Sequence, residues 1–356
     1  MTDKLKRDID REIKVFLAEA DKKYGLNKIS PLLFSGIKDF LMRPGKRIRP
    51  ILFILAYEGY SKKSSISPRE LIRASLSIEL LHDFLLIHDD IIDRSELRRG
   101  RPAMHKFFGH KLGVSPTSGI GEGLGIVAGD IIYALAMEAF LASDETLRRK
   151  EKALKELIAA TVFTGVGEFI DITGGSKSID LISRKEIFDI YTLKTAKYTF
   201  EGPMRIGAAL AGAKDSELNK LSKLGIILGR AFQILDDMLD IFMTSKNTGK
   251  PILSDLSESK KTLLAREAYH RLDSASGRIF KRLFTKINKT KRDLERLKKL
   301  IKNTDAPEYC LATIYGLLEE AGSVINGLGI KKRQKDTIAG LVKDLHAKTK
   351  TVERSI

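Results

Sequence analysis

Apolar residues recur along most of the chain at spacings of three and four, which is the period of an α-helix. Five stretches are so densely apolar that they predict helices buried on most sides, not helices with one apolar stripe. Alternation with a period of two, which would indicate half-buried strands, is not found in the sequence. The buried helices are expected over residues 71–93, 126–141, 157–172, 206–213 and 221–242.

These helices are expected to form one domain. The chain has 356 residues, enough for one large domain or for two to three ordinary ones. Neither a Gly/Ser linker nor an internal repeat divides it. The glycines within residues 113–125 predict a flexible connection between helices, because no strand precedes them and no GK[ST] follows them, as nucleotide-binding loops require. We therefore expect a single all-α domain over residues 1–356.

The cysteine content and the terminal segment bear on the compartment. The one cysteine, Cys310, excludes an internal disulfide and a CxxC metal site, and it fits a reducing compartment. No uncharged apolar run approaches the roughly 20 residues that a membrane-spanning helix needs. The first twenty residues mix both charge signs and lack the apolar segment of a signal peptide. These features predict a cytoplasmic protein.

The charge is strongly basic and unevenly spread. Lys and Arg number 63 against 46 Asp and Glu, a net charge of +17. Residues 278–302 hold eleven basic and two acidic residues, so about half of the excess lies there. A Lys-rich helical hairpin in solvent is the simplest interpretation, and contact with an anionic membrane surface is the alternative. Nucleic-acid binding is not expected, because the segment lacks zinc-ligand spacing and an aromatic-rich RNA-binding pattern.

Two aspartate clusters carry the most specific chemical signal. The first is HDDIID at residues 88–93, and the second is QILDDMLD within residues 233–240. In each cluster the outer aspartates are four residues apart, so a helix places them on one face. Their mutual repulsion, among apolar neighbours, calls for a cation. All-oxygen ligands suit Mg²⁺, which keeps waters and takes phosphate oxygens as further ligands.

Basic residues surround both clusters. GKRIRP occupies residues 45–50, RRGRP follows the first cluster at residues 98–102, and lysines flank the second cluster at positions 194, 197, 250, 260 and 261. Arginine binds phosphate oxygens in pairs and lysine acts as a point charge. The pattern predicts a site for highly anionic, Mg²⁺-bridged groups. The sequence offers no arrangement of Ser, His and Asp that would indicate a nucleophilic mechanism.

The order and spacing of these motifs resemble the trans-isoprenyl diphosphate synthase family over residues 46–262. The matching motifs are GKRIRP, His82 seven residues before Asp89, DDIIDRSELRRGRPAMH, Gly129-Asp130, KTAKYTFEGP, FQILDDMLD and GKPILSDLSESKKT. The resemblance implies an all-α isoprenoid synthase fold, with central helices around a deep pocket and an aspartate motif on each of two facing helices. It also implies a homodimer, a motif-bearing core at residues 45–262 and a basic helical C-terminal part at residues 263–356.

The resemblance further implies the roles of individual residues. By it, Asp89, Asp93 and Asp236 bind Mg²⁺ with Asp240 in support, and three ions are expected with substrate bound. Isopentenyl diphosphate would be held by Lys46, Arg49, His82 and Arg99. The allylic diphosphate would be held by Arg98, Lys194, Thr195, Gln233, Lys250 and Lys260, of which Arg98, Lys194 and Lys250 also stabilise the leaving group.

The implied reaction is Mg²⁺-dependent elongation of dimethylallyl, geranyl or farnesyl diphosphate by isopentenyl diphosphate. Phe84 stands five residues before Asp89, about 7.5 Å along a helix axis, and next to Leu85, a geometry that permits contact with the growing product without requiring it. The resemblance implies that these two residues limit product length. One aromatic residue there, without an insertion in the motif, resembles archaeal-type geranylgeranyl diphosphate synthases. We expect a C20 product, with the C15 farnesyl product or a mixture as the alternative.

Two departures and two rival functions accompany the resemblance. Glu168 stands where the family usually has Gln, so a local hydrogen bond of the family is expected to differ here. Ser259 stands where the family usually has Gly. Ser tolerates positive φ less well than Gly, so the second departure bears on a loop conformation. A class I terpene cyclase would share the metal chemistry, but GKRIRP, His82 and Arg99 indicate a second diphosphate site. A non-catalytic partner subunit is disfavoured by two complete aspartate motifs.

Overall fold

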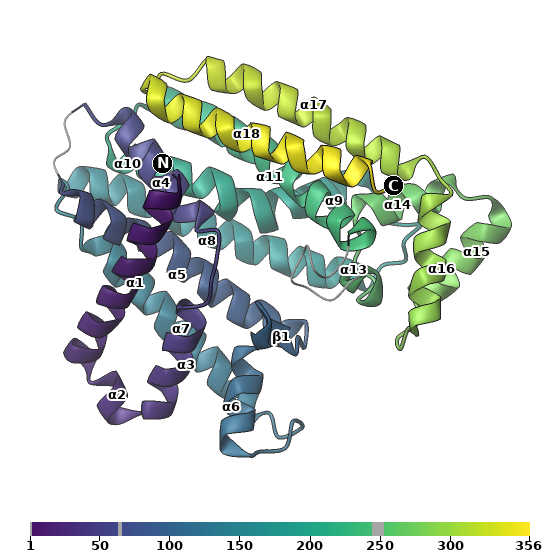
Figure 1. The fold of residues 1–356 in the computed structure, drawn as a ribbon, viewed down its shortest axis with the longest axis horizontal. Coiled ribbons are helices and arrows are strands. Elements are labelled where there is room, and N and C mark those ends of the chain that lie inside the picture. Colours follow the sequence, from purple (N-terminus) through teal and green to yellow (C-terminus); the bar gives the residue numbers. More distant parts are fainter. Residues whose placement is uncertain (1, 63–65, 244–252) are drawn as a thin grey trace. The chain divides into compact units, whose positions relative to one another are not determined.

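The computed structural model describes residues 2–62, 66–243 and 253–356, and their regular structure is almost entirely helical (Figure 1). The chain divides into two compact units. Unit 1 comprises Met1–Ile158 and Pro203–Lys214, and unit 2 comprises Ala159–Gly202 and Asp215–Ile356. The predicted all-α class is confirmed; the described strands are β1 (Leu97–Arg98) and β2 (Arg101–Pro102), which pair antiparallel.

Unit 1 is built around two long helices, α5 (Pro68–Ile92) and α7 (Ile120–Leu141), which pack against each other. Helix α5 begins with a capping box, in which the Ser67 hydroxyl accepts from the Glu70 N–H and the Glu70 carboxylate accepts from the Ser67 N–H. The other elements of this unit are α1 (Thr2–Tyr24), α2 (Leu26–Ile29), α3 (Pro31–Leu41), α4 (Ile48–Tyr60), α6 (Met104–Leu112), the first part of α8 (Leu147–Gly175) and most of α10 (Gly202–Leu210).

The close packing of α5 on α7 requires a residue without a side chain at Gly129. A Cβ atom at this position would lie 2.6 Å from Nε2 of His88 on α5, closer than atoms approach without a bond between them. Glycine in a helix interior costs about 1 kcal/mol relative to alanine, and the contact that it allows explains its presence. The packing therefore brings the Gly129-Asp130 pair of α7 beside the first aspartate cluster.

The expectation of a loop over residues 113–125 is wrong for its second half. Helix α6 ends at a left-handed Gly113, and α7 already begins at Ile120 after a left-handed Gly119. The remaining glycines of the stretch lie inside α7. A Cβ atom at Gly121 would lie 2.6 Å from the His105 carbonyl oxygen, and one at Gly125 would lie 3.3 Å from the His105 Cβ, so these two glycines allow α6 to approach α7 closely.

Unit 2 has α11 (Asp215–Phe242) as its central helix, which packs against η1 (Tyr191–Glu201) and α17 (Ala306–Asn326). Element η1 is a π-helix, a wider helix that is rare and often marks a functional site. The unit also contains residues 159–175 of α8, together with α9 (Arg184–Ile190), α13 (Ser254–Ser257), α14 (Leu263–Arg271), α15 (Ser274–Phe284), α16 (Lys291–Lys302) and α18 (Lys332–Glu353).

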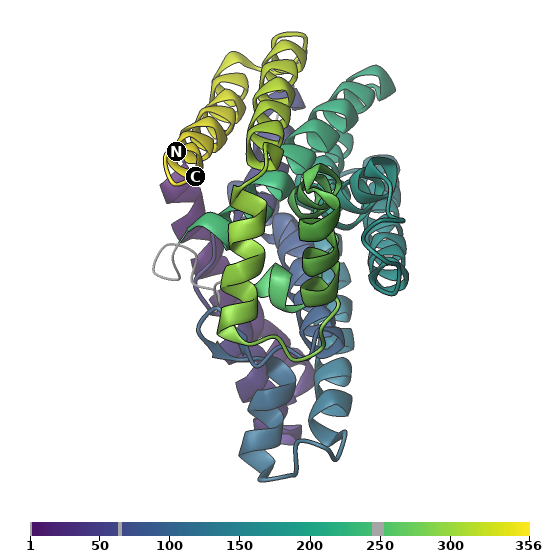
Figure 2. The same cartoon turned by 90° about the vertical axis from the view of Figure 1, so that its right-hand side faces the viewer.

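The five helices predicted from apolar periodicity are all present. They correspond to α5, α7, α8, α10 and α11. All five begin several residues before the predicted start, and α5 and α10 end before the predicted end. The lysine-rich segment forms α15 and α16, which contact each other and run side by side in both views (Figures 1 and 2).

Two described helices, α7 and α8, are long and apolar enough by composition to cross a membrane when up to two charged residues are tolerated. The core helix of a soluble protein meets the same criterion. In α7 the apolar residues include a buried set that packs against α5 and α6, which is the behaviour of a core helix.

Candidate active site

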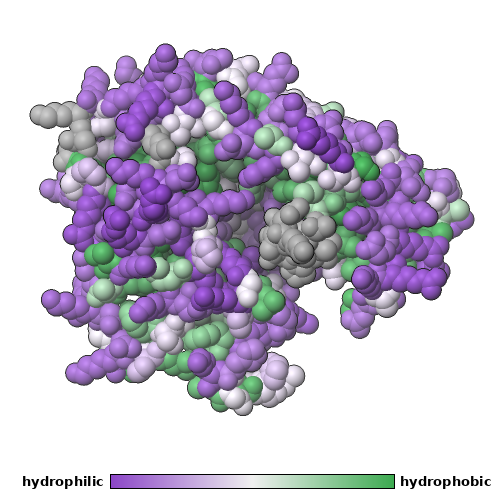
Figure 3. All heavy atoms as spheres, viewed as in Figure 1, coloured by the Kyte–Doolittle hydropathy of each residue, from purple (hydrophilic) through white to green (hydrophobic). Residues whose placement is uncertain are grey.

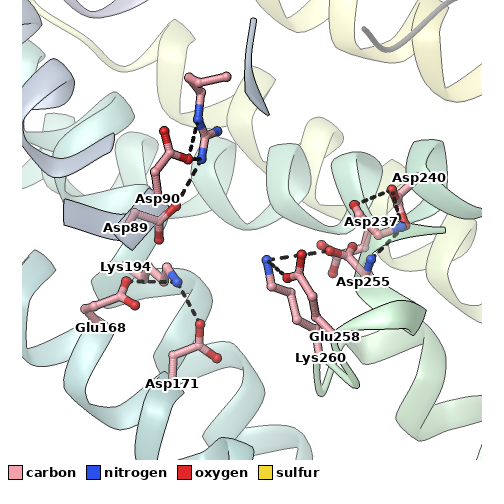
Figure 4. Close-up of polar contacts among 12 residues, drawn as sticks. Asp89, Asp90, Glu168, Asp171, Lys194, Asp237, Asp240, Asp255, Glu258 and Lys260 are labelled. Carbon is pink, nitrogen blue, oxygen red and sulfur yellow. Dashed lines mark hydrogen bonds and ion pairs between the residues drawn. The ribbon is translucent and has the colours of Figure 1, made fainter. Parts of the chain in front are cut away.

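The first aspartate cluster lies at the C-terminal end of α5. Asp89 occupies the last turn, and Asp93 follows the helix as its cap, with its N–H donating to the Asp89 carbonyl at 2.8 Å. Asp90 lies between them but is fully buried, and its Oδ1 accepts from Nε of Arg98 at 2.8 Å. Nη2 of Arg98 is also 3.4 Å from Oδ2 of Asp89 (Figure 4). The buried middle aspartate therefore holds Arg98 against the partly exposed Asp89.

The pKa of Asp90 shows two opposing effects. Burial raises the pKa, while the hydrogen bond and charge of Arg98 oppose the rise. The charge of Asp89 beside it adds to the rise. An added cation next to Asp89 would relieve this repulsion, which is the electrostatic situation predicted for a metal-binding cluster.

The arginine-rich loop after the cluster is held by a buried arginine that the sequence analysis did not select. Arg43 has a side chain that is 1% exposed and pairs with Asp39 at 2.7 Å. It donates to the carbonyl of Arg98 at 3.0 Å and to that of Pro102 at 2.8 Å. These bonds fix both strands of the β1–β2 turn, in which Arg99 has a φ of 53°. Arg43 therefore positions the two arginines expected to bind diphosphate.

His82 lies about two helical turns before Asp89 and is buried among arginines. Burial, together with the positive charges of Arg49, Arg99 and Arg98, lowers the pKa of His82 well below its ordinary value. The imidazole is therefore neutral at pH 7 and serves as a hydrogen-bonding group, not as a cation. The structure thus brings together His82, Arg49 and Arg99, three of the residues expected to bind isopentenyl diphosphate.

The basic residues of GKRIRP have different positions. Lys46 is exposed and Arg49 is half-buried, whereas Arg47 between them is buried and pairs with Glu79 at 2.7 Å and with Asp10 at 2.8 Å. Arg47 has a φ of 52° and precedes α4 as its cap. The sequence shows Glu79 within an apolar run, but it does not show which cation of the motif pairs with it.

A buried carboxyl next to His82 completes the surroundings of this half-site. Asp83 lies 3.8 Å from Nη2 of Arg99. Burial, with a contribution from the nearby charge of Glu79, raises the pKa of Asp83 to about 7. Arg98 and Arg99 therefore each lie beside a buried carboxyl, Asp90 and Asp83 respectively.

The second aspartate cluster lies on α11 in unit 2 and has the same division between middle and outer residues. Asp237 is buried; its Oδ2 accepts from the Tyr191 hydroxyl and its Oδ1 from Nε2 of Gln233 at 2.8 Å. Burial and the charge of Asp255 raise the pKa of Asp237 well above its ordinary value. Asp236 is only half-buried.

A chain of hydrogen bonds links this cluster to η1. The Thr195 hydroxyl donates to Oε1 of Gln233 at 2.8 Å, and the Gln233 amide donates onward to Asp237. The Tyr191 hydroxyl, which donates to Asp237, accepts from the N–H of Leu263 at 2.8 Å. Thr195 and Gln233 are thus brought together as expected, while Tyr191 is a structural member that sequence reasoning missed.

Asp240, the last aspartate of the second cluster, is engaged in local structure. Its Oδ1 accepts from the Ser254 hydroxyl at 2.7 Å and from the Ser254 N–H at 3.2 Å. Its Oδ2 accepts from the N–H of Asp255 at 3.1 Å. Asp240 therefore fixes α13 beside α11, as Figure 4 shows.

The loop after α13 contains Ser259, which stands where the family usually has glycine. This loop has the left-handed backbone conformation that glycine adopts more easily than serine. Ser259 has a φ of 61°, the left-handed region, and its hydroxyl donates to the Phe284 carbonyl at 2.6 Å. Lys289 in turn donates to the Ser259 hydroxyl at 2.7 Å. These bonds offset the strain of a side chain at positive φ. Lys260 follows and pairs with Glu258 at 2.8 Å.

Lys194 lies on η1 between two carboxylates of α8. Its ammonium is 2.8 Å from Oε2 of Glu168 and 2.8 Å from Oδ2 of Asp171 (Figure 4). Glu168 is the residue that departs from the family pattern. A glutamine there would offer Lys194 an amide oxygen in place of a charge, so the departure adds a negative charge beside a predicted substrate-binding cation.

The predicted chain-length residues lie on α5 in unit 1. Phe84 is half-buried, and its ring centroid is 4.5 Å from that of His88 and 5.2 Å from that of Tyr133 on α7. Leu85 is also half-buried. Neither belongs to the fully buried core. Lys250, expected in the same site as Lys194, lies outside the described residues.

The aspartates fit Mg²⁺ as a substrate-bridging ion. Within the part of the chain that the structure describes, no three or more acidic, histidine or cysteine side chains gather as a closed metal cage. The carboxylates left partly exposed are Asp89 and Asp93 in the first cluster and Asp236 in the second, because the middle aspartates and Asp240 are buried and hydrogen-bonded within the protein. Mg²⁺ suits such a site, since it retains waters and takes substrate phosphates as ligands.

Comparison with known proteins identifies the class. Residues 31–302 match the Polyprenyl synthetase family. The chain is 34% identical over 265 residues to a short chain isoprenyl diphosphate synthase of Methanocaldococcus jannaschii, covering 74% of this chain and 72% of that protein. The crystal structure of a geranylgeranyl pyrophosphate synthetase from Pyrococcus horikoshii aligns with a TM-score of 0.79 and 26% identity, covering 96% of this chain and 98% of that one.

A third comparison concerns the fold. A geranylgeranyl pyrophosphate synthase from Corynebacterium glutamicum, crystallised with isoprenyl diphosphate and magnesium, aligns with a TM-score of 0.89 and 24% identity over 97% of this chain and 99% of that one. The chain belongs to the Polyprenyl synthetase family, whose members depend on Mg²⁺. It is a transferase of the trans-prenyltransferase class, and the resemblance inferred from its motifs is confirmed.

Proposed function

We propose that the protein condenses isopentenyl diphosphate with dimethylallyl, geranyl and farnesyl diphosphates to make all-trans geranylgeranyl diphosphate. The observation that carries the proposal is the shared design of the two aspartate clusters. Each has a buried middle aspartate that is paired within the protein, and each leaves an outer aspartate partly exposed beside cations or polar groups. Relatives named as geranylgeranyl and short chain synthases support the product class.

We propose that Asp89, Asp93 and Asp236 bind Mg²⁺, with three ions when substrate is present. Asp240 has a supporting role, since its carboxylate already accepts three hydrogen bonds from α13. When bound, Mg²⁺ neutralises the diphosphate and makes it a better leaving group. The motif match through both units supports one isoprenoid synthase domain over the whole chain.

The cations divide between two substrates. Arg49, Arg99 and neutral His82 form one group, which we assign with Lys46 to isopentenyl diphosphate. The allylic diphosphate is assigned to Arg98 and to the residues of unit 2 around η1 and α11, namely Lys194, Thr195, Gln233 and Lys260, together with Lys250. Guanidinium and ammonium groups stabilise the negative charge that grows on a departing diphosphate.

In the proposed reaction the bond between C1 of the allylic substrate and its diphosphate oxygen breaks. The diphosphate leaves with the electron pair, aided by Arg98, Lys194 and Lys250. The double bond of isopentenyl diphosphate supplies the electrons for the new carbon–carbon bond, and a proton is lost. Apolar side chains around the reacting carbons would exclude water, which would otherwise trap the cation.

A shorter C15 product is the second candidate, and one observation favours it. The rings of Phe84, His88 and Tyr133 lie together beside the first aspartate cluster. Three rings reduce the space for a growing chain more than one ring does. A mixture of farnesyl and geranylgeranyl diphosphates would follow if this space is only just long enough.

The direct test is product analysis. Incubation with Mg²⁺, isopentenyl diphosphate and dimethylallyl diphosphate, followed by chromatography, should give a C20 diphosphate.

Asp89→Ala and Asp236→Ala should each lower turnover by several orders of magnitude while the fold survives, because removal of one charge from a repulsive cluster leaves no core cavity. Asp144→Ala, at an exposed position, is the matched control. Near-normal turnover in either cluster variant would refute the metal assignment, and a cyclic hydrocarbon product would indicate a terpene cyclase.

We also propose a homodimer and a cytoplasmic location. In unit 2, α8 exposes an apolar stripe of Val162, Val166, Phe169 and Ile172, with exposed fractions from 45% to 68%. Their spacing places them on one helix face, and a contiguous apolar face of this kind suits contact with a second copy. The same chemistry gives no reason to expect nucleic acid as a partner.

A further inference from the structure

The hairpin of α15 and α16, residues 274–302, has two unlike faces; we call it the basic hairpin. Its inner face is apolar and buried in unit 2, where Phe280, Phe284, Leu297 and Ile301 are 0% exposed. Its outer face carries cations at helical spacing. Arg278 and Arg282 are four residues apart on α15, and Arg292, Arg296 and Lys299 follow one face of α16; all five are exposed.

Most of this charge is not neutralised inside the protein. Among the described residues, Lys281 pairs with Asp180 at 2.9 Å and Lys286 pairs with Asp293 at 2.6 Å. The five outer cations have no ion pair within 4 Å in that part of the chain. So many like charges on one small element repel one another, and they are tolerated where a polyanionic partner compensates them. Hydrophilic side chains dominate this part of the surface in Figure 3.

The tip between the two helices adds an apolar group to the cations. Ile287 is 92% exposed, the largest exposure among the large apolar side chains of the described residues. It lies between Lys286 and Lys291, both exposed. A single aliphatic side chain exposed to water costs little free energy. When it lies between cations, however, it is suited to insertion below a layer of anionic headgroups.

We propose that the basic hairpin docks the enzyme on anionic phospholipid membranes, with Ile287 inserted and the outer cations on the headgroups. Nucleic acid is the other polyanion to consider. The aromatic residues of the hairpin, Phe280 and Phe284, are buried and stacked on each other, so they are not available to stack on bases. Ile287 has no counterpart in phosphate binding. The docking goes beyond the proposed function, and it would suit that function, because a C20 diphosphate is an amphiphile that partitions into membranes.

The test uses the full-length protein and two kinds of vesicle, one of phosphatidylcholine alone and one of phosphatidylcholine and phosphatidylglycerol in equal parts. Co-sedimentation should show binding to the anionic vesicles that weakens with salt, and at least tenfold weaker binding to the neutral ones. The Arg282→Gln/Arg292→Gln variant should lose at least tenfold in binding to anionic vesicles, since each basic residue near such a surface contributes several-fold. The Lys343→Gln/Lys348→Gln variant, with equal charge loss at exposed positions of α18, should bind like the unchanged protein.

Ile287→Ser separates insertion from attraction by charge. It should weaken binding to anionic vesicles several-fold and leave the salt dependence unchanged. Prenyltransferase activity in solution without vesicles should be unchanged in all of these variants, so failure of docking and failure of the proposed function are read separately. Equal binding of the hairpin variant and the control variant would overturn the proposal. So would full binding by Ile287→Ser, or tighter binding of the unchanged protein to duplex DNA than to anionic vesicles.

Discussion

Adjacent aspartates in the two clusters have opposite surroundings. The Asp89 side chain is 24% exposed, whereas that of Asp90 is 0% exposed and pairs with Arg98. On α11, Asp237 is buried against Tyr191, whereas Asp236 is half-buried. Successive residues of a helix point about 100° apart, so one aspartate of each pair faces the protein and the other faces the candidate site. The middle aspartates are therefore positioning residues for Arg98 and Gln233.

Phe84 permits a prediction on product length. Phe84→Ala should lengthen the main product by one or more five-carbon units, because removal of the ring opens space beside Tyr133 and His88. Chromatography of the products from isopentenyl and dimethylallyl diphosphates measures the change. Phe107→Ala, on α6, provides an aromatic truncation outside this cluster. An unchanged product length in Phe84→Ala would show that Phe84 does not limit the chain.

Glu168 permits a prediction on substrate affinity. In Glu168→Gln, Lys194 keeps Asp171 as a partner but loses one of its two neutralising charges. Its attraction for diphosphate should rise, and a gain of about 1.4 kcal/mol would correspond to tenfold. Steady-state kinetics should show a several-fold lower KM for the allylic substrate with little change in the KM for isopentenyl diphosphate. A higher allylic KM would instead mean that Glu168 is needed to orient Lys194, and Lys194→Ala gives the limit of complete loss.

At the scale of elements, the close packing of η1 on α11 places the second half-site. Gly229 of α11 faces Ala196, where a Cβ atom would lie 2.2 Å from that of Ala196. The two helices therefore approach closely at Gly229 and Ala196, near Gln233 and Lys194 in the sequence. Thr195 is consequently within hydrogen-bonding distance of Gln233, while Lys194 is directed to α8. Adjacent residues of η1 therefore serve partners on two different helices.

The contact between α9 and α14 predicts a dependence of stability on pH. Glu267 of α14 is buried and pairs with Arg184, Arg271 and Arg266. Burial alone would raise its pKa, but the hydrogen bonds from these arginines lower the pKa of Glu267 to about 2. A carboxyl with a lowered folded pKa stabilises the protein above its unfolded pKa, and this contribution is lost as the pH falls through the folded pKa.

The free energy of unfolding should therefore fall by about 3 kcal/mol through this group between about pH 5 and pH 2. Urea unfolding at a series of pH values measures the slope. Glu267→Gln should be less stable at pH 7, because its arginines lose their buried partner, and its stability should depend less steeply on acid. An equally steep acid dependence in Glu267→Gln would assign the effect to other carboxyls.

At the scale of the whole molecule, the apolar stripe of α8 predicts the oligomeric state. Val166 is 45% exposed at the middle of the stripe, so Val166→Glu should leave the fold intact and place a charge in the proposed contact between copies. Light scattering should give a dimer mass for the unchanged protein and a monomer mass for the variant. Leu181→Glu, at an apolar position 71% exposed outside the stripe, should remain dimeric. A dimer mass for Val166→Glu would show that this stripe is not the interface.

The sequence alone determined the all-α class, the positions of the main helices and the two aspartate clusters. These features depend on local patterns, namely apolar periodicity and charges four residues apart, which a helix converts directly into a buried side and an acidic face. The family also followed from motif order. The local signal misled where it was ambiguous, as at residues 121–125, where glycines that usually interrupt helices instead lie within α7.

Only the tertiary structure decided which charged residue of each motif faces inward. Arg47, Asp90 and Asp237 look equivalent to their neighbours in the sequence, yet each is buried against a partner on another element. The partner is 8 residues away for Asp90, 32 for Arg47 and 46 for Asp237. Arg43 likewise reaches the carbonyl of Pro102, 59 residues away. Burial and pairing of this kind depend on the packing of separate helices, and a local pattern carries no information about it. The same packing gave Lys194 its two carboxylates, because α8 and η1 are brought together only by the fold.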